Sequence, residues 1–243
     1  GRVLDSSATG TVTAAAASEN IYAGGLIGYN TEADVSGCFA TGQVVSGQSA
    51  GGTDIGGLIG YNYEAGIDNC YATGAVESDV SSLSRIGGLT GYNKYGTISN
   101  CHAEGNVTGA GYVYMGGLAG QSYSENTKGS GTSVVTILAS ITDSYATGNV
   151  VATSNPEDCP IGGLVGANST TYTDSLQNVT YGIINCYATG SVSETGGEAY
   201  IGGLVGFNQA VSIQYCFSAG DVSASSGSAA GGFVGSNRSQ AVI

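Results

Sequence analysis

Small apolar residues alternate with aromatic or polar residues in a short segment that recurs seven times along the chain. In the copy from Cys70 to Val76, the residues Cys, Ala, Gly and Val occupy every second position, with Tyr71, Thr73 and Ala75 between them. A period of two residues predicts a β-strand with one buried face. The glycine of this segment is present in every copy, at Gly10, Gly42, Gly74, Gly105, Gly148, Gly190 and Gly220.

A second segment, Gly-Gly-Leu/Phe-x-Gly, alternates with the first and also occurs seven times. Its copies begin at Gly24, Gly56, Gly87, Gly116, Gly162, Gly202 and Gly231. It predicts another short strand, with its Leu pointing inward and its glycines where two sheets approach closely. An Asn follows most copies and predicts a turn, because Asn tolerates left-handed backbone and caps turns with its side chain.

The two segments repeat at intervals of about thirty residues, which is typical of stacked coils. We expect two or three short strands per coil, joined by corners, with successive coils about 4.8 Å apart. Because parallel crossover connections are almost always right-handed, the sequence predicts an all-β, right-handed, single-stranded parallel β-helix of about seven coils. We expect this solenoid to occupy residues 1–243 as one domain. Both ends interrupt the repeat instead of capping it, so we also expect a segment of a longer exported protein.

The Gly-Gly-Leu segment resembles the GLUG motif, which is named for Gly-Leu-(hydrophobic)-Gly. Residues 57–60 match it in full, and the other six copies also match, except that Phe233 replaces Leu in one copy and Thr90 or Ala119 stands at the hydrophobic position in two others. GLUG repeats occur in bacterial surface and adhesin-like proteins and in the non-catalytic part of IgA-cleaving metallopeptidases. The resemblance therefore implies an extracellular or cell-surface location and a non-catalytic role as a stalk or binding module. The alternative that it leaves open is an accessory substrate-binding domain of a secreted peptidase or polysaccharide-active enzyme.

The charge of the chain narrows the possible partners. Lys and Arg total 5 against 18 Asp and Glu, which gives a formal net charge of −13. Nucleic acids and anionic membrane surfaces are bound by clustered cations, whereas the cations here are scattered along the sequence. They are Arg2, Arg85, Lys94, Lys128 and Arg238. We expect no nucleic-acid binding and no membrane insertion; the expected partners are a host glycan or protein, or other segments of the parent chain.

Catalytic and metal sites need residue patterns that this sequence does not show. The single histidine, His102, lies in the aromatic column of the first segment, so neither a zinc-binding His pair nor a Ser-His-Asp triad is expected. The acidic residues are dispersed over turns, which does not favour the paired carboxylates of a glycosidase. We therefore predict no catalytic residue, no enzymatic activity, no cofactor and no metal site. A polysaccharide-cleaving enzyme and calcium bound by turn residues stay open as lesser alternatives.

Two side-chain columns run through the first segment. Five of the six cysteines share one column, at Cys38, Cys70, Cys101, Cys186 and Cys216. Their expected spacing of about 4.8 Å exceeds the roughly 3.8 Å between Cβ atoms that a disulfide needs, so we predict a buried ladder of free thiols. Cys159 lies outside this column. The next column is aromatic and contains Phe39, Tyr71, His102, Tyr145, Tyr187 and Phe217. These rings could stabilise the sheet by stacking or bind sugar rings.

Two long insertions, at residues 122–141 and 168–183, interrupt the repeat in consecutive coils at the same corner. Insertions on one face of a solenoid often form its binding surface. We expect the two insertions to emerge side by side, with an added strand over residues 134–138. The candidate binding residues are Tyr123, Lys128, Tyr172, Asp174 and Tyr181. Loops without a function are the alternative.

Overall fold

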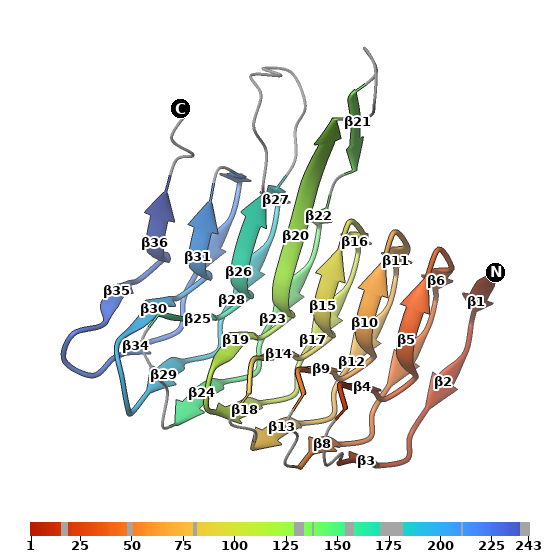
Figure 1. The fold of residues 1–243 in the computed structure, drawn as a ribbon, viewed down its shortest axis with the longest axis horizontal. Coiled ribbons are helices and arrows are strands. Elements are labelled where there is room, and N and C mark those ends of the chain that lie inside the picture. The colour runs from red at the N-terminus through yellow and green to blue at the C-terminus, as the bar shows by residue number, and fades with distance from the viewer. Residues whose placement is uncertain are drawn as a thin grey trace.

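The computed structural model describes residues 1–15, 19–47, 51–79, 82–128, 134–137, 139–153, 158–170, 182–209 and 211–238. These residues form 36 β-strands, which wind into a rod of seven coils with the two termini at opposite ends (Figure 1). Within the described part of the chain, no helix is long and apolar enough to cross a membrane.

Each coil contributes one strand to each of five parallel sheets, which we name A to E in the order that the chain visits them. Sheet A contains β1 (Arg2–Leu4), β6 (Asp34–Ser36), β11 (Gly66–Asp68), β16 (Thr97–Ser99), β22 (Ser140–Thr142), β27 (Gly182–Ile184) and β32 (Ser212–Gln214). Sheet B contains β2 (Ser7–Ala8), β7 (Phe39–Ala40), β12 (Tyr71–Ala72), β17 (His102–Ala103), β23 (Tyr145–Ala146), β28 (Tyr187–Ala188) and β33 (Phe217–Ser218). Sheet C contains β3 (Val12–Ala14), β8 (Val44–Ser46), β13 (Val76–Asp79), β18 (Val107–Ala110), β24 (Val150–Thr153), β29 (Val192–Glu194) and β34 (Val222–Ser223).

The remaining two sheets are built from the Gly-Gly-Leu segment and its neighbours. Sheet D contains β4 (Ile21–Gly24), β9 (Thr53–Gly56), β14 (Ser84–Gly87), β19 (Val113–Gly116), β25 (Cys159–Gly162), β30 (Ala199–Gly202) and β35 (Ala229–Gly231). Sheet E contains β5 (Ile27–Thr31), β10 (Ile59–Tyr63), β15 (Thr90–Lys94), β20 (Ala119–Lys128), β26 (Val165–Thr170), β31 (Val205–Gln209) and β36 (Val234–Arg238). The predicted parallel β-helix is confirmed, but each coil has five strands where we expected two or three.

The first segment holds two strands instead of one because its glycine forms a corner. In the third coil, β12 ends at Ala72 and β13 begins at Val76. A Cβ atom on Gly74, which lies between them, would be 2.5 Å from the carbonyl carbon of Gly42 in the preceding coil. No side chain fits at that distance, so the glycine allows the chain to turn from sheet B into sheet C. The alternation of period two continues through the corner and conceals it in the sequence.

The Gly-Gly-Leu segment is a second corner, between sheets D and E. Leu58 is fully buried, as predicted, but it lies between β9 and β10 and not within a strand. A Cβ atom on Gly57 would be 2.8 Å from the Cβ atom of Ala72. One on Gly60 would be 2.8 Å from the backbone oxygen of Asp54 in sheet D. The glycines of this segment therefore let sheet E fold back closely against the backbone of sheet D.

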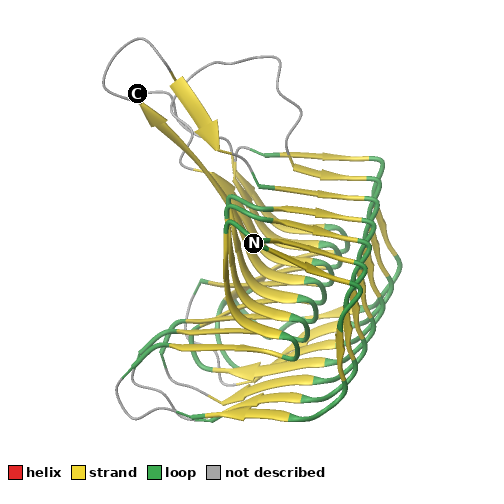
Figure 2. Cartoon of the chain, turned by 90° about the vertical axis from the view of Figure 1, so that its right-hand side faces the viewer, coloured by secondary structure: helices red, strands yellow, loops and turns green. Residues whose placement is uncertain are grey.

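Two apolar cores run along the rod. The first contains the buried leucines and the cysteine column, and includes Val35, Leu58 and Cys70. The second lies between sheets C and D and includes Val76 and Ile86. Seen along the rod (Figure 2), sheets D and E form a V that opens outward, so that their outer faces are turned towards each other.

The predicted ladder of free thiols is confirmed, because all six cysteines are unbridged. The backbone N–H of Cys38 donates a hydrogen bond to the Sγ atom of Cys70 over 3.3 Å, and the Cys70 thiol donates to the carbonyl oxygen of Asp68 over 3.2 Å. Cys159 lies outside the ladder, as expected, and is buried in the second core. The thiols thus pack as small apolar groups that also satisfy backbone atoms.

Buried Asn side chains form another ladder along sheet E. Asn30 Nδ2 donates to Asn62 Oδ1 over 2.8 Å, and Asn62 Nδ2 donates to Asn93 Oδ1 over 2.9 Å. Asn62 Nδ2 also donates to the carbonyl oxygen of Ala65 in the following turn, over 2.9 Å. The predicted capping by the side chain is confirmed. The left-handed backbone is found two residues later, for example at Glu64, where φ is 50°.

Ser122 interrupts the Asn ladder in the fourth coil. It pairs in register with Asn93 on one side and Asn168 on the other. Its hydroxyl group is buried and has no hydrogen-bond partner among the described residues. At this position β20 does not turn but continues as a long strand to Lys128.

Candidate functional site

The first insertion is a β-hairpin that extends sheet E beyond the rod (Figure 1). The added strand, β21 (Val134–Ile137), pairs antiparallel with β20, with Lys128 opposite Val134. This confirms the strand that we expected over residues 134–138 for residues 134–137; Leu138 lies outside the described residues. At the base of the hairpin, Ser124 on β20 pairs with Thr170 on β26, so the two insertions begin side by side. Tyr123 lies on β20, whereas Tyr172, Asp174 and Tyr181 lie outside the described residues.

Tyr123 belongs to a larger group of tyrosines that we did not predict from the sequence. This tyrosine cluster consists of Tyr22 on β4, Tyr29 on β5, Tyr61 and Tyr63 on β10, Tyr92 on β15, Tyr95 just after β15, and Tyr123 on β20. A signal for it was present, because Tyr29, Tyr61 and Tyr92 all precede an Asn of the ladder.

The cluster joins the outer faces of sheets D and E. Tyr29 and Tyr61, both on sheet E, stack with ring centroids 5.0 Å apart and planes 4° apart. Tyr22 reaches both of them from sheet D in edge-to-face contacts, at centroid distances of 5.2 Å and 5.6 Å. Tyr22 is 39% exposed and Tyr29 is 54% exposed. Aromatic rings are thus available to a ligand at the opening of the V.

Crossed ring contacts continue into the next coils. Tyr61 and Tyr92 meet at 5.2 Å and 86°, and Tyr95 meets Tyr123 at 5.8 Å and 39°. A cation lies near several of these rings: the Lys94 Nζ atom is 5.0 Å from the centroid of Tyr95. Contacts of this kind stabilise a cation against the negative face of the ring.

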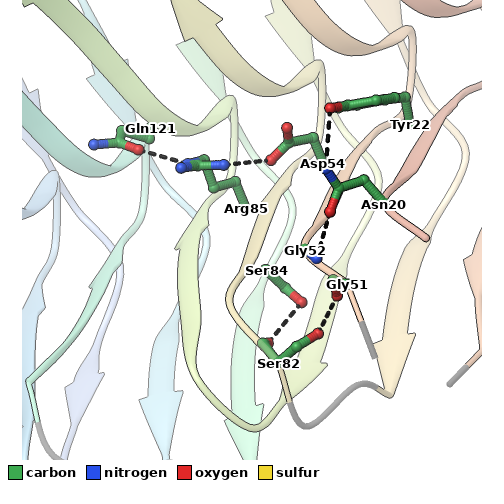
Figure 3. A network of polar contacts seen from close by, with 9 residues as sticks. All are labelled: Asn20, Tyr22, Gly51, Gly52, Asp54, Ser82, Ser84, Arg85 and Gln121. Atoms are coloured by element: carbon green, nitrogen blue, oxygen red, sulfur yellow. Dashed lines mark hydrogen bonds and ion pairs between the residues drawn. The ribbon is translucent and has the colours of Figure 1, made fainter. Parts of the chain in front are cut away.

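A chain of polar side chains crosses from sheet D to sheet E beside the rings (Figure 3). Arg85 Nη1 donates to Asp54 Oδ1 over 2.9 Å, and Arg85 Nε donates to Gln121 Oε1 over 2.6 Å. Gln121 Nε2 in turn donates to the Ser169 hydroxyl over 3.3 Å. The Arg85 guanidinium also lies 4.0 Å from the centroid of the Tyr92 ring. Four consecutive coils are connected in this way, and the planar groups are held in fixed orientations.

Burial sets the protonation of this site. Asp54 is only 4% exposed, and burial raises the pKa of its carboxyl group while the neighbouring Arg85 opposes that rise. Burial also raises the pKa values of the Tyr61 and Tyr92 phenols far above the ordinary range. Both phenols therefore stay uncharged at physiological pH and keep a proton that can be donated in a hydrogen bond.

Tyr95 attaches the hairpin to the preceding coil. Its hydroxyl group donates a hydrogen bond to Glu125 on β20. Its backbone is left-handed, with φ of 62°, at the position that Glu32 and Glu64 occupy in earlier coils. A bulky residue in this region is strained, and the bond to Glu125 contributes to holding it there. The hairpin and the tyrosine cluster consequently form one continuous surface.

Residues 19–45, 51–77 and 82–108 match the family model of the GLUG motif. The chain carries GLUG repeats. The expected resemblance is confirmed, and the three matched GLUG repeats contain every tyrosine of the cluster except Tyr123. No curated protein and no solved structure matches the chain.

The three matched repeats also carry the first three rings of the aromatic column on sheet B, where the rings are arranged differently. Tyr71 stacks on Phe39 at 4.9 Å and on His102 at 5.0 Å, with planes within 2° and 6°. The stack continues through Tyr145 and Tyr187 to the end of the column. Each inner ring has both faces covered by its neighbours. This favours the structural interpretation of the column over the binding of sugar rings.

The GLUG repeats offer little for metal chemistry in the part of the chain that the structure describes. No group of three or more His, Cys, Asp or Glu residues lies close enough to hold a metal ion there. His102 is placed between two stacked rings, with Glu104 3.8 Å from its Nε2 atom.

Proposed function

We propose that the chain is a non-catalytic β-helical module of a bacterial cell-surface protein, serving as a rigid stalk that also binds a host glycan or protein. One observation carries the proposal: a regular rod with GLUG repeats presents a cluster of partly exposed tyrosine rings beside a hairpin, where sheets D and E face each other. GLUG repeats are known in surface proteins, which supports a location outside the cell.

The internal bonding of the rod supports the role of a stalk. Equivalent residues pair in parallel from coil to coil, for example Ile59 with Ile27 and with Thr90. The Asn ladder and the two continuous cores add contacts between the same neighbours. A solenoid in which every coil holds the next is stiff over its whole length.

Two features support a binding role without catalysis. The buried carboxylate of Asp54 is engaged by Arg85 and is not paired with a second carboxylate as glycoside hydrolysis requires. The only histidine of the sequence lies within the aromatic stack of sheet B. The net charge of −13 supports the exclusion of nucleic acid as a partner.

Three measurements test this proposal. Antibody labelling of intact cells is expected to detect the chain at the surface, and the purified chain is expected to bind host cells or host matrix in a saturable way. Incubation with peptide and polysaccharide substrates is expected to release no product. A chain found only inside the cell, or one that cleaves a substrate, contradicts the proposal.

A further inference from the structure

We propose that the tyrosine cluster binds a neutral polysaccharide, with the sugar chain lying along the rod. This inference rests on the binding role proposed above and specifies its ligand.

The rings of the cluster are arranged so that some faces stay open. Tyr22 meets Tyr29 at 68° and Tyr61 at 72° between the ring planes. In a crossed pair, one ring presents its edge, and the faces of that ring are not covered by its partner. An open tyrosine face binds the C–H side of a sugar ring, and the phenol hydroxyl is available for hydrogen bonds to sugar hydroxyls.

The polar groups beside the rings are of the kind that bind hydroxyl groups. The Arg85 guanidinium is partly exposed and has paired N–H donors, whereas Asp54 and Gln121 are buried and orient it. Their mutual hydrogen bonds of 2.9 Å and 2.6 Å hold them in place before a ligand arrives. A site organised in advance loses less conformational entropy on binding. Specific recognition of hydroxyl groups needs this fixed geometry.

The charge of the site favours an uncharged ligand. The Arg85 cation is neutralised by Asp54, and the Lys94 cation lies against the rings of Tyr63 and Tyr95. Tyr95 in turn contacts the acidic Glu125. An anionic polymer would approach a chain of net charge −13 and would find no unengaged Arg85 to compensate it. A cationic peptide would find the buried carboxylate of Asp54 already paired. A neutral polymer meets neither obstacle.

The extent of the site favours a polymer over a single sugar. Tyr29, Tyr61 and Tyr92 occupy the same register position in three successive coils of sheet E. In the next column of the sheet, Tyr63 and Tyr123 flank Lys94 in register. Tyr92 is only 8% exposed, so the accessible rings are Tyr29 and Tyr61 in the first column and Tyr63 and Tyr123 in the second. A ligand extended along the rod therefore meets accessible aromatic groups in several coils, which are about 4.8 Å apart. Affinity should rise with the number of sugar units until the chain spans the cluster.

The test uses the full chain and measures binding by isothermal titration calorimetry. The probes are soluble mannan, galactan and xyloglucan as neutral polysaccharides, their oligosaccharides of increasing length, and polygalacturonate as the acidic counterpart. At least one neutral probe is expected to bind, with affinity rising with length, and polygalacturonate is expected to bind at least tenfold more weakly. Tyr29→Ala and Tyr63→Ala are each expected to weaken binding of the neutral probe about tenfold, the loss of one aromatic contact.

Phe217→Ala is the matched control, because Phe217 is also aromatic and is 54% exposed, the same fraction as Tyr29, but lies at the end of the stack on sheet B. It is expected to leave binding unchanged, and circular dichroism checks that all three variants are folded. Equal losses in Phe217→Ala and Tyr29→Ala, preference for polygalacturonate, or no binding of any polysaccharide overturns the inference. Binding to a host protein without any polysaccharide overturns the glycan assignment while leaving the proposed function intact.

Discussion

Sheet B and the tyrosine cluster place aromatic rings at the same coil spacing and yet produce opposite surfaces. On sheet B the rings of Tyr145 and Tyr187 lie 4.8 Å apart with planes within 3°. In the cluster, Tyr29 and Tyr61 also stack, but Tyr22 meets these two rings from sheet D at 68° and 72°. The stack on sheet B covers both faces of its inner rings, whereas a crossed contact leaves the faces of one ring uncovered by its partner. Aromatic content alone therefore does not identify a binding site on a solenoid.

The difference arises from the surroundings of each column. Sheet B strands are two residues long and face outward alone, so each ring has only its neighbours in the stack to contact. The outer face of sheet E is opposed by sheet D, and Tyr22 and Arg85 enter from that side. A site arises where two sheets converge and the repeat is broken.

The largest effect is expected from a substitution at the corner between sheets D and E, which positions both sheet B and the tyrosine cluster. In Gly57→Val the added side chain would meet the backbone of the next coil and Ala72 at once. We expect a loss of at least about 3 kcal/mol in the free energy of unfolding, because overpacking at backbone cannot be relieved by a rotamer change. Urea denaturation followed by circular dichroism measures it. Gly52→Ala is the control, since its nearest atoms would be 3.5 Å away; equal stability of the two variants would show the corner to be tolerant.

The next effect is confined to the tyrosine cluster. Arg85→Leu leaves the Asp54 carboxylate buried without its guanidinium, which should cost about 3 kcal/mol near neutral pH. The raised pKa of Asp54 then rises further, so the penalty is largest above the folded pKa and shrinks as the pH falls and the carboxyl group takes up a proton. Urea midpoints at pH 8 and pH 4 measure this dependence, because the first pH lies well above the ordinary Asp pKa of about 3.9 and the second lies close to it.

A double variant supplies the control for that prediction. Asp54→Leu combined with Arg85→Leu removes both charges and should recover most of the lost stability. A penalty for Arg85→Leu that did not change with pH, or that persisted in the double variant, would show that the ion pair is not what the substitution disturbs.

A smaller effect is expected on sheet B. Tyr145→Ala removes contacts with His102 at 4.8 Å and with Tyr187 at 4.8 Å. At about 0.5–1.5 kcal/mol for each aromatic pair, the loss in unfolding free energy should be about 2 kcal/mol. Thermal denaturation measures it, and binding to the neutral polysaccharide serves as the second readout. Reduced affinity in this variant would contradict the distinction between the two surfaces.

The smallest effect is expected from restoring the Asn ladder in the fourth coil, where Ser122 interrupts it. Ser122→Asn should allow a side-chain amide to bridge Asn93 and Asn168, with a gain of about 1 kcal/mol in unfolding free energy. Differential scanning calorimetry would detect the accompanying rise in melting temperature. The reverse change, Asn62→Ser, removes bonds to Asn93 and Ala65 and should lower it. If Ser122→Asn and Asn62→Ser have the same melting temperature, the amide ladder contributes no stability.

The fold could be predicted from the sequence because equivalent residues recur in register, and every coil repeats the same pattern of buried positions and corners. The thiol ladder followed from the column of Cys70 and its equivalents for the same reason. The number of strands could not be predicted, because Gly74 preserves the alternation while turning the chain. Leu58 was expected in a strand but lies at a corner. The sequence could not distinguish the two positions, because a buried Leu is compatible with both.

The candidate site was predictable only in part. The added strand opposite Lys128 and the position of Tyr123 at the hairpin followed from the length of the insertion. The contact of Tyr22 with Tyr61 could not be inferred, because it requires the angle between sheets D and E. Nor could the pairing of Asp54 with Arg85, whose proximity depends on the register between coils.

The six unlinked sulfur atoms have a consequence for how such a rod is made. Folding of the rod needs no disulfide-forming oxidase and no disulfide isomerase. A reductant that unfolds disulfide-bonded secreted proteins finds no disulfide to reduce here. Each coil can pack on the one before it without waiting for a covalent crosslink. The finished rod is expected to keep its shape under oxidising and reducing conditions alike.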